Sequence, residues 1–270
     1  MSAEGGISRV LRALQTFKKR PERVTVPVFG VSVFLLWEFL VRATNTPAYL
    51  MPGPIAIVRT LWFRLISNGL IVPHLLITLQ EILIGYVIAI AAGVTLGTLI
   101  SQIYIVEKMF KPYIIAFAAV PKIALAPLFI IWFGFGIASK VVIVVLVAFF
   151  PMLINTINGL NSADPMTIEL FKSLGATKWQ IFRMLKVPNA MPYLFAGLDI
   201  GAVFAVTGAI VAEFVGSQGG LGHLALRMQY EFNIPGYFAV LFVIVPLGLV
   251  MHFIVTAAQR RVVFWIHTDR

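Results

Sequence analysis

The sequence predicts an all-α membrane protein, a polytopic helical bundle of about six transmembrane helices. Apolar residues make up 60% of the 270-residue chain and charged residues only 12%, whereas soluble domains are about half apolar and about a quarter charged. So much apolar surface must face lipid. The Lys and Arg residues lie in short runs between apolar stretches, so the net charge of +10 does not indicate nucleic-acid binding. The chain has no cysteine, which excludes disulfides and Cys-based metal or redox sites.

Six stretches are long and apolar enough, or nearly so, to cross a bilayer core of about 30 Å, which takes roughly 20 helical residues. Backbone groups in lipid must be satisfied within the segment, so these stretches are expected to be helices. The expected spans are residues 24–41, 82–101, 112–134, 140–157, 193–215 and 237–255. Five or seven spans are the alternatives.

The expected organisation is one transmembrane domain over residues 24–260, between a basic N-terminal segment (1–23) and a short tail (261–270). The first span is expected to be retained, because the 23 residues before it are long for a signal peptide and no clear cleavage site follows. No internal repeat is visible, which disfavours transporters built from two homologous halves.

Charge in the connections predicts the orientation, since cytoplasmic loops are enriched in Lys and Arg. With the N-terminus inside, fifteen Lys and Arg residues fall in cytoplasmic segments: six before the first span, two after the second, four after the fourth and three after the last. Only five fall in outer segments: Arg42, Arg59, Arg64, Lys140 and Arg227. Both termini are therefore expected in the cytoplasm.

Two spans carry small residues spaced four apart, a pattern that lets helix backbones approach closely in lipid. The stripes are Gly85, Ala89, Gly93, Gly97 and Ser101 in the second span, and Gly197, Gly201, Ala205 and Ala209 in the fifth. They predict a tightly packed bundle.

The third span contains Pro121 and Pro127 on either side of Lys122. Proline removes a backbone donor and kinks a helix, and broken helix at membrane depth is tolerated only against protein or water. The break predicts either the wall of a translocation pathway or a kink absorbed by packing. Lys122 and Asp199 lie deep within their spans, where charge is costly. They are expected to form a structural ion pair or to line the pathway.

Other polar residues in the spans are weaker candidates. Asn155 and Glu213 are assigned to the pathway, although Asn155 also fits a role as an interhelical hydrogen-bond partner. Glu38 and Glu81 lie near predicted span ends, where snorkelling to the interface is expected. His252 is expected to pack within the bundle.

No catalytic site is predicted. Asp199 and Glu213 share a helix, where fourteen residues separate them by about 21 Å, too far for a carboxylate pair. The four histidines lack metal-ligand spacing, and there is no P-loop. We therefore expect no catalytic residue, no metal and no cofactor on this chain. A stand-alone channel or secondary carrier is the alternative class.

The segment at residues 164–190 is too charged to span and too apolar for a plain loop. Asp164 followed by proline starts a first helix, which Gly175 ends. Thr177 and Gln180 form a capping box for a second helix, which Pro188 is expected to end. Each helix has an apolar stripe: Ile168, Phe171 and Leu174 in the first, and Trp179, Phe182 and Leu185 in the second. A pair lying on the membrane surface is the alternative interpretation.

This segment resembles the cytoplasmic loop motif of ABC importer permeases, Glu-Ala-Ala, three residues, Gly, nine residues, Ile-x-Leu-Pro. Glu169 stands six residues before Gly175, and Pro188 stands thirteen after it. Leu170 and Phe171 replace the two alanines, and Leu185 and Val187 replace Ile and Leu. The resemblance implies a coupling helix that seats in a groove of an ATPase subunit. The residues it assigns to coupling are Glu169, Phe171, Gly175, Ala176, Trp179, Leu185 and Pro188.

Other parts are similar to the nitrate, sulfonate, taurine and thiamine-precursor branch of these permeases: residues 50–62 (LMPGPIAIVRTLW), 121–144 (PKIALAPLFIIWFGFGIASKVVIV) and 219–224 (GGLGHL). The resemblance implies a multi-pass protein of the bacterial inner membrane, paired with a second permease copy. It also implies two ABC ATPase subunits, which use the ATP, and an external substrate-binding protein. The expected cargo is a small anion such as a sulfonate or nitrate. The alternative is a neutral or cationic heterocycle such as a thiamine precursor.

Overall fold

The computed structural model describes residues 22–265, and all regular elements within that range are helices. Five helices are long and apolar enough to cross a membrane, or six if one bent pair counts as a single span. The predicted fold class is therefore confirmed. The five helices are α2 (Glu22–Ala43), α4 (Ile71–Ser101), α7 (Ile137–Asn161), α10 (Val187–Gly216) and α12 (Ile234–Val262). Most of the predicted N-terminal segment and the end of the predicted tail lie outside the described residues.

The bent pair is the third span. Its first part is α5 (Tyr104–Ala119), and its second is a 3₁₀ turn (Lys122–Leu125) continued by α6 (Ala126–Phe133). The two parts meet at 74°. Val120 and Pro121 at the break have non-helical backbone angles. The predicted irregularity of this span is confirmed.

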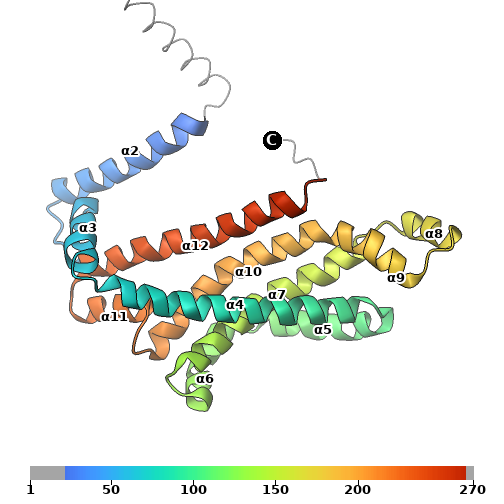
Figure 1. The fold of residues 1–270 in the computed structure, drawn as a ribbon. Coiled ribbons are helices and arrows are strands. Elements are labelled where there is room, and N and C mark those ends of the chain that lie inside the picture. The colour runs from blue at the N-terminus through green and yellow to red at the C-terminus, as the bar shows by residue number, and fades with distance from the viewer. Residues whose placement is uncertain (1–21, 266–270) are drawn as a thin grey trace, which may run out of the picture.

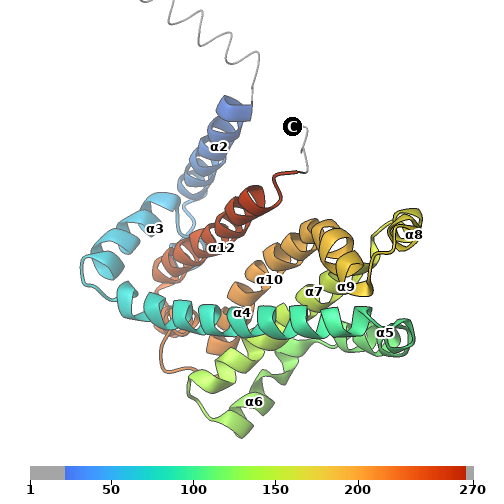
Figure 2. The same ribbon diagram turned by 45° about the vertical axis from the view of Figure 1, so that its right-hand side comes forward.

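Shorter helices lie at the two ends of the bundle (Figures 1 and 2). At one end are α3 (Pro54–Thr60), α6 and α11 (Leu221–Tyr230). A π-helical turn (Leu61–Ile66) continues α3. At the other end are α8 (Pro165–Ser173) and α9 (Lys178–Ile181). We name these the α11 end and the α8 end.

The small-residue stripe of α4 packs directly on α7. A Cβ atom on Gly85 would lie 2.5 Å from Val144, one on Gly93 would lie 2.5 Å from Met152, and one on Gly97 would lie 2.7 Å from Thr156. Each contact joins residues 59 positions apart, and such a constant offset means that the two helices run in the same direction. The bent pair between them therefore returns the chain across the bundle as one span, which gives six spans.

The second stripe packs on a neighbouring face of α7, and Met152 contacts both stripes. Gly197 approaches Asn155 and Pro151, and Gly201 approaches Ala148 and Met152. Here the sequence number falls on one helix as it rises on the other, so α10 runs antiparallel to α7. The predicted tight bundle is confirmed as a core of three helices, α4, α7 and α10.

Span boundaries differ from the prediction mainly in α4, which begins eleven residues early and is 31 residues long. Its extra turns carry Thr78 and Glu81, both buried against other helices. Thr78 has hydrogen-bond partners inside the bundle, and burial keeps Glu81 away from lipid, so neither residue ends the span. Glu81 does not snorkel, and that expectation is wrong.

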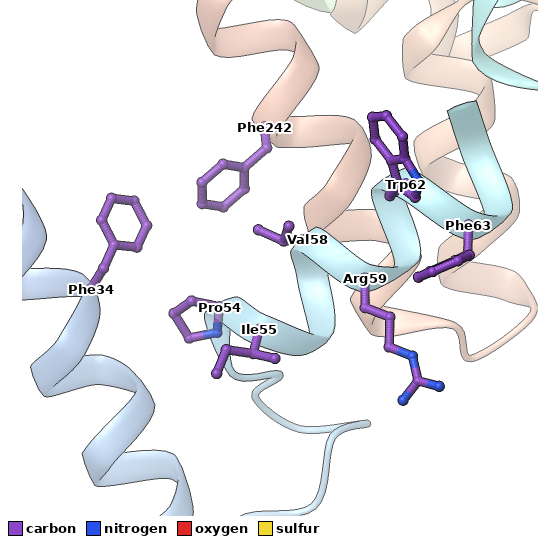
Figure 3. Close-up of a pocket in the computed structure, with 8 residues that line it drawn as sticks. All are labelled: Phe34, Pro54, Ile55, Val58, Arg59, Trp62, Phe63 and Phe242. Carbon is purple, nitrogen blue, oxygen red and sulfur yellow. The ribbon is translucent and has the colours of Figure 1, made fainter. Parts of the chain in front are cut away.

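Helix α2 lies at the side of the bundle and packs on α12 through aromatic side chains. The rings of Phe34 and Phe242 are 5.9 Å apart, and those of Trp37 and Phe238 are 6.1 Å apart. A groove of about 650 Å³ opens between α2, α3 and α12 (Figure 3). Its lining is apolar except for Arg59, and no predicted pathway residue contributes to it.

Candidate functional site

The first helix of the 164–190 segment starts as predicted. The Asp164 carboxylate accepts hydrogen bonds from the Thr167 hydroxyl at 2.8 Å, the Thr167 N–H at 3.0 Å and the Met166 N–H at 3.4 Å. These bonds, led by that from the Thr167 side chain, hold the pKa of Asp164 below its ordinary value. They satisfy donors that the first turn of a helix leaves free.

The turn between the two short helices depends on Gly175, whose φ is +79°. The Gly175 N–H donates to the Lys172 carbonyl at 2.9 Å, and the Ala176 N–H donates to the Phe171 carbonyl at 3.0 Å. This is the Schellman arrangement, in which a residue at positive φ closes the helix. The predicted glycine stop is therefore confirmed, and the backbone leaves the first helix at an angle.

The second helix begins at the predicted capping box, in which Thr177 and Gln180 hydrogen-bond reciprocally. It does not end at Pro188, and that expectation is wrong. A π-helical turn at Phe182–Lys186 joins α9 to α10, so that helix continues from Lys178 to Gly216. Proline in a helix clashes with the carbonyl of the preceding turn, and a wider π turn just before it relieves such a clash.

The outer surface of this segment is apolar and exposed. Met166, Leu174 and Trp179 are 80%, 77% and 65% exposed. The Trp179 ring stacks on Phe182 at 5.5 Å. Of the other residues assigned to coupling, Glu169 is exposed, and Phe171, Ala176, Leu185 and Pro188 are half-buried. Large apolar side chains at the α8 end, beyond the spans, form a surface that another protein can cover.

At the break in the third span, Lys122 points back toward its own helix. Its ammonium donates to the carbonyls of Ala118 at 2.6 Å and Val120 at 3.3 Å and lies 4.6 Å from the centre of the Phe150 ring. The break leaves those carbonyls without helical partners, so the lysine satisfies them. Pro121 caps the 3₁₀ turn, and Pro127 lies in the first turn of α6, where proline is tolerated.

Asp199 pairs with His252 of α12, with Oδ1 and Nδ1 2.5 Å apart. The proposed pair between Asp199 and Lys122 is therefore wrong. His252 packs within the bundle, as expected, and is also the partner of Asp199. Asn155 donates to the Pro151 carbonyl of its own helix at 2.9 Å. Lys122 contacts Phe150 of α7, and Asn155 is itself a residue of α7. Asp199 instead belongs to the α10–α12 contact.

Glu213 belongs to a buried cluster that the sequence analysis did not assemble, formed by Thr78, Glu81, Lys140 and Glu213. Glu81, Lys140 and Glu213 are 2%, 1% and 1% exposed. The Thr78 hydroxyl donates to Glu213 Oε1 at 2.6 Å. The ammonium of Lys140 donates to the Phe135 and Gly136 carbonyls and is an electrostatic neighbour of both glutamates, although no ion pair within 4 Å joins them in the described part of the chain.

A sequence signal for this cluster exists. Glu81 lies near the start of α4, Lys140 near the start of α7 and Glu213 near the end of α10, so alternating topology places all three at the same end of the bundle. Among the described residues, no group of three His, Cys, Asp or Glu side chains could hold a metal ion.

A bundle of membrane-spanning helices that presents an apolar helix–turn–helix beyond its spans, beside a broken span bearing a charge, has the features of a membrane transport subunit. The model of the family "Binding-protein-dependent transport system inner membrane component" matches residues 85–264, about two thirds of the chain, and the chain belongs to this family. It is the permease subunit of an ABC importer, as the resemblance of its loop motif predicted.

The relatives are named for different cargoes. The chain is 40% identical to the formylaminopyrimidine transport permease protein ThiX of Halalkalibacterium halodurans, over 86% of this chain and 92% of the relative. It is 33% identical to the riboflavin transport system permease protein RibX of Chloroflexus aurantiacus, over 96% of each. It is 29% identical to the putative aliphatic sulfonates transport permease protein SsuC of Bacillus subtilis, over 86% of this chain and 84% of the relative.

The fold is shared with solved ABC transporter structures. An inward-facing crystal form of the MetNI methionine ABC transporter superposes with a TM-score of 0.60 at 21% identity, covering 78% of this chain and 98% of that one. At this identity the likeness supports the fold and not the substrate.

Proposed function

We propose that two copies of this chain form the translocation pathway of an ATP-driven importer in the bacterial inner membrane. Two ABC ATPase subunits bind the 164–190 segments, and an external binding protein delivers the solute at the α11 end. Both chain termini face the cytoplasm in this arrangement, as the basic residues predict. ATP is bound and hydrolysed by the ATPase subunits, and this chain supplies no catalytic group or cofactor.

The exposed apolar surface of the 164–190 segment carries this proposal. Leu174 lies at the end of α8 and Trp179 at the start of the helix that continues into α10, and Gly175 sets the turn between them. Large apolar side chains at the centre of an interface commonly supply most of its binding energy. The segment lies beyond the membrane-spanning helices, and the charge distribution assigns it to the cytoplasmic side, where ATP is available.

Assembly of the chain with an ABC ATPase subunit tests this proposal. The chain, expressed with its cognate ABC ATPase, is expected to co-purify as a complex. Trp179→Ala is expected to weaken that complex at least tenfold, since central aromatic anchors often contribute about 2 kcal/mol or more. Tyr230→Ala, which removes an exposed aromatic at the opposite end, is the matched control. Unchanged assembly of Trp179→Ala would contradict the assignment of this surface.

For the cargo, we propose a small nitrogen heterocycle of the thiamine-precursor type. The 40% identity to a formylaminopyrimidine permease over most of both chains supports this choice. In vesicles that contain the complex and its binding protein, labelled formylaminopyrimidine is expected to accumulate with ATP. A pyrimidine that does not enter under conditions where a sulfonate does would contradict it.

A small anion is the second candidate, and Lys122 at the break of the third span favours it. The lysine is already engaged by two carbonyls and a ring, so it needs no acidic partner and keeps its positive charge available to an anion. If an anion is the cargo, Lys122→Met should slow its uptake and Lys122→Arg should retain it. Equal rates in all three proteins would remove the support for an anion.

A further inference from the structure

The buried cluster fastens the start of α11 to two spans. The Leu221 N–H donates to Thr78 Oγ1 at 2.7 Å, and the Gly222 N–H donates to Glu213 Oε2 at 2.5 Å. A Cβ on Gly222 would lie 2.7 Å from the Ile210 carbonyl oxygen, so α11 touches the backbone of α10 there. The first turn of α11 is thus held by α4 and α10 together.

The charges of the cluster do not balance unless a proton is added. Glu81 and Glu213 bring two carboxyl groups, Lys140 brings one ammonium, and all three are buried. An unpaired ionised carboxylate is very costly in such a place. One protonated acid makes the cluster neutral, with one ammonium, one carboxylate and one carboxylic acid.

Hydrogen-bond geometry shows which acid holds the proton. Both oxygens of Glu213 accept bonds from protein donors, so Glu213 is the carboxylate. Glu81 Oε2 is buried and has no hydrogen-bond partner among the described residues. Glu81 is an electrostatic neighbour of Glu213, and a buried carboxyl oxygen that receives no donor is far less costly when the carboxyl group is protonated and uncharged. Glu81 is therefore the acid.

The same glutamate that holds α11 ends a long helix. The helix from Lys178 to Gly216 has 39 residues, about 58 Å at 1.5 Å per residue. Trp179 lies at its α8 end and Glu213 at its α11 end. Its middle packs closely on α7 through Gly197 and Gly201. A helix held along its length transmits displacement from one end to the other.

We propose that Glu81, Glu213 and Lys140 form a neutral cluster, with the added proton on Glu81, that makes α11 move as one body with the 164–190 segment. Docking at the α11 end and movement of the ATPase subunits are thereby mechanically linked. This rests on the proposed function and deepens it. Glu213 is a positioning residue in this role, acting through the backbone of α11 and not through contact with the solute.

Matched Glu→Gln changes test the cluster. Glutamine is a neutral replacement for a protonated acid, so Glu81→Gln should preserve the amide exchange of residues 217–230. Glu213→Gln puts an amide NH₂ group against either the Thr78 hydroxyl or the Gly222 N–H, both of which are donors. Amide exchange at Gly222 should therefore become about tenfold faster or more. Glu231→Gln, an exposed glutamate at the end of α11, is the control. Infrared absorption from a protonated carboxyl group should be present in the wild type and lost in Glu81→Gln; its absence from the wild type would overturn the proton assignment.

Coupling is read from ATP hydrolysis by the reconstituted complex, as the ratio of the rate with binding protein to the rate without it. The ratio should fall toward one in Glu213→Gln and stay at the wild-type value in Glu81→Gln and Glu231→Gln. If Glu213→Gln does not fold, Thr78→Val removes the same hydroxyl bridge and Thr78→Ser restores it. The proposal is overturned if the stimulation of ATP hydrolysis by binding protein is unchanged in both Glu213→Gln and Thr78→Val. It is also overturned if that stimulation is lost in Glu81→Gln. A wild-type chain that fails to assemble with the ATPase would instead refute the proposed function.

Discussion

His252 of α12 lies with its Nδ1 atom 2.5 Å from Oδ1 of Asp199 on α10, across 53 residues of sequence. Both side chains are partly exposed in the single chain. Nearby, the Tyr86 hydroxyl donates to the Leu198 carbonyl at 2.7 Å, so α4, α10 and α12 are joined by polar contacts at one level of the bundle. The last span is thus tied to the core by hydrogen bonding as well as by apolar packing.

We expect Asp199→Ala and His252→Ala each to lower the free energy of unfolding of the purified chain by about 1 kcal/mol, because each removes one hydrogen bond that partial exposure weakens. The double variant should lose less unfolding free energy than the two single variants together, by roughly 0.5 kcal/mol or more, because substitutions at contacting residues are not additive. Denaturation in detergent measures both quantities. Strict additivity would show that the two side chains do not interact.

Lys122 and Asp199 should behave as independent residues, because each has other partners. Lys122→Met and Asp199→Asn are expected to combine additively, within roughly 0.5 kcal/mol, in the same unfolding measurement. The double variant should not recover any loss caused by Lys122→Met. Recovery would indicate an ion pair that forms in another state of the transporter.

Gly175 should be intolerant of β-branched residues for a backbone reason alone, since nothing lies within 4 Å of a Cβ placed there. Gly175→Val should cost about 1–3 kcal/mol at its positive φ and abolish transport by misplacing α9, while Gly175→Asn should retain it. Gly69, at φ +66° with equally open surroundings, offers the matched control. Gly69→Val should strain its turn similarly yet leave ATPase binding intact, and equal loss in both variants would argue against a local coupling role.

Topology can be checked with single cysteines, because the native chain has none. A cysteine replacing Asn68, in the exposed turn before α4, should react with an impermeant thiol reagent in intact cells. One replacing Lys178, at the start of α9, should react only after permeabilisation. Reaction of the second in intact cells would place the 164–190 segment outside and overturn the orientation.

Asp164 should cap α8 throughout the neutral range. Its pKa is lowered by hydrogen bonds, so the cap is fully present above the ordinary Asp pKa and is lost only as pH falls through the lowered value. After correction for intrinsic rates, amide protection at Met166 and Thr167 should be flat from about pH 5 to 8. Asp164→Ala should lose that protection, and Asp164→Asn should largely keep it. A rise in exchange toward pH 5 would contradict the lowered pKa.

The spans, the small-residue stripes, the first short helix and the start of the second were predictable because their signals are local. Asp164, Gly175 and Thr177 each act on backbone groups a few residues away. The cluster of Glu81, Lys140 and Glu213 was missed, because its members belong to three helices and a charge near a span boundary resembles an interfacial residue. Only the bundle end that alternating topology gives all three would have brought them together. The same limit applies to Asp199, since nothing in the sequence around it distinguishes His252 from Lys122 as its partner.

The π-helical join before Pro188 could not be foreseen for another reason. A proline after a short helix usually marks its end, and only the packing of α10 on α7 makes continuation of the helix favourable. Tertiary contacts over the following thirty residues of α10 thus override the local signal.

The fixed offset of 59 residues between α4 and α7 has a consequence for biosynthesis. The ribosome delivers α4 to the membrane while the residues that will face Gly85, Gly93 and Gly97 have yet to be translated. The glycine face of α4 must therefore wait in lipid, without its partner, until the bent third span has been inserted and α7 has followed. A nascent chain arrested before α7 would display that face to other membrane helices, which makes this interval the stage of synthesis most exposed to wrong pairing.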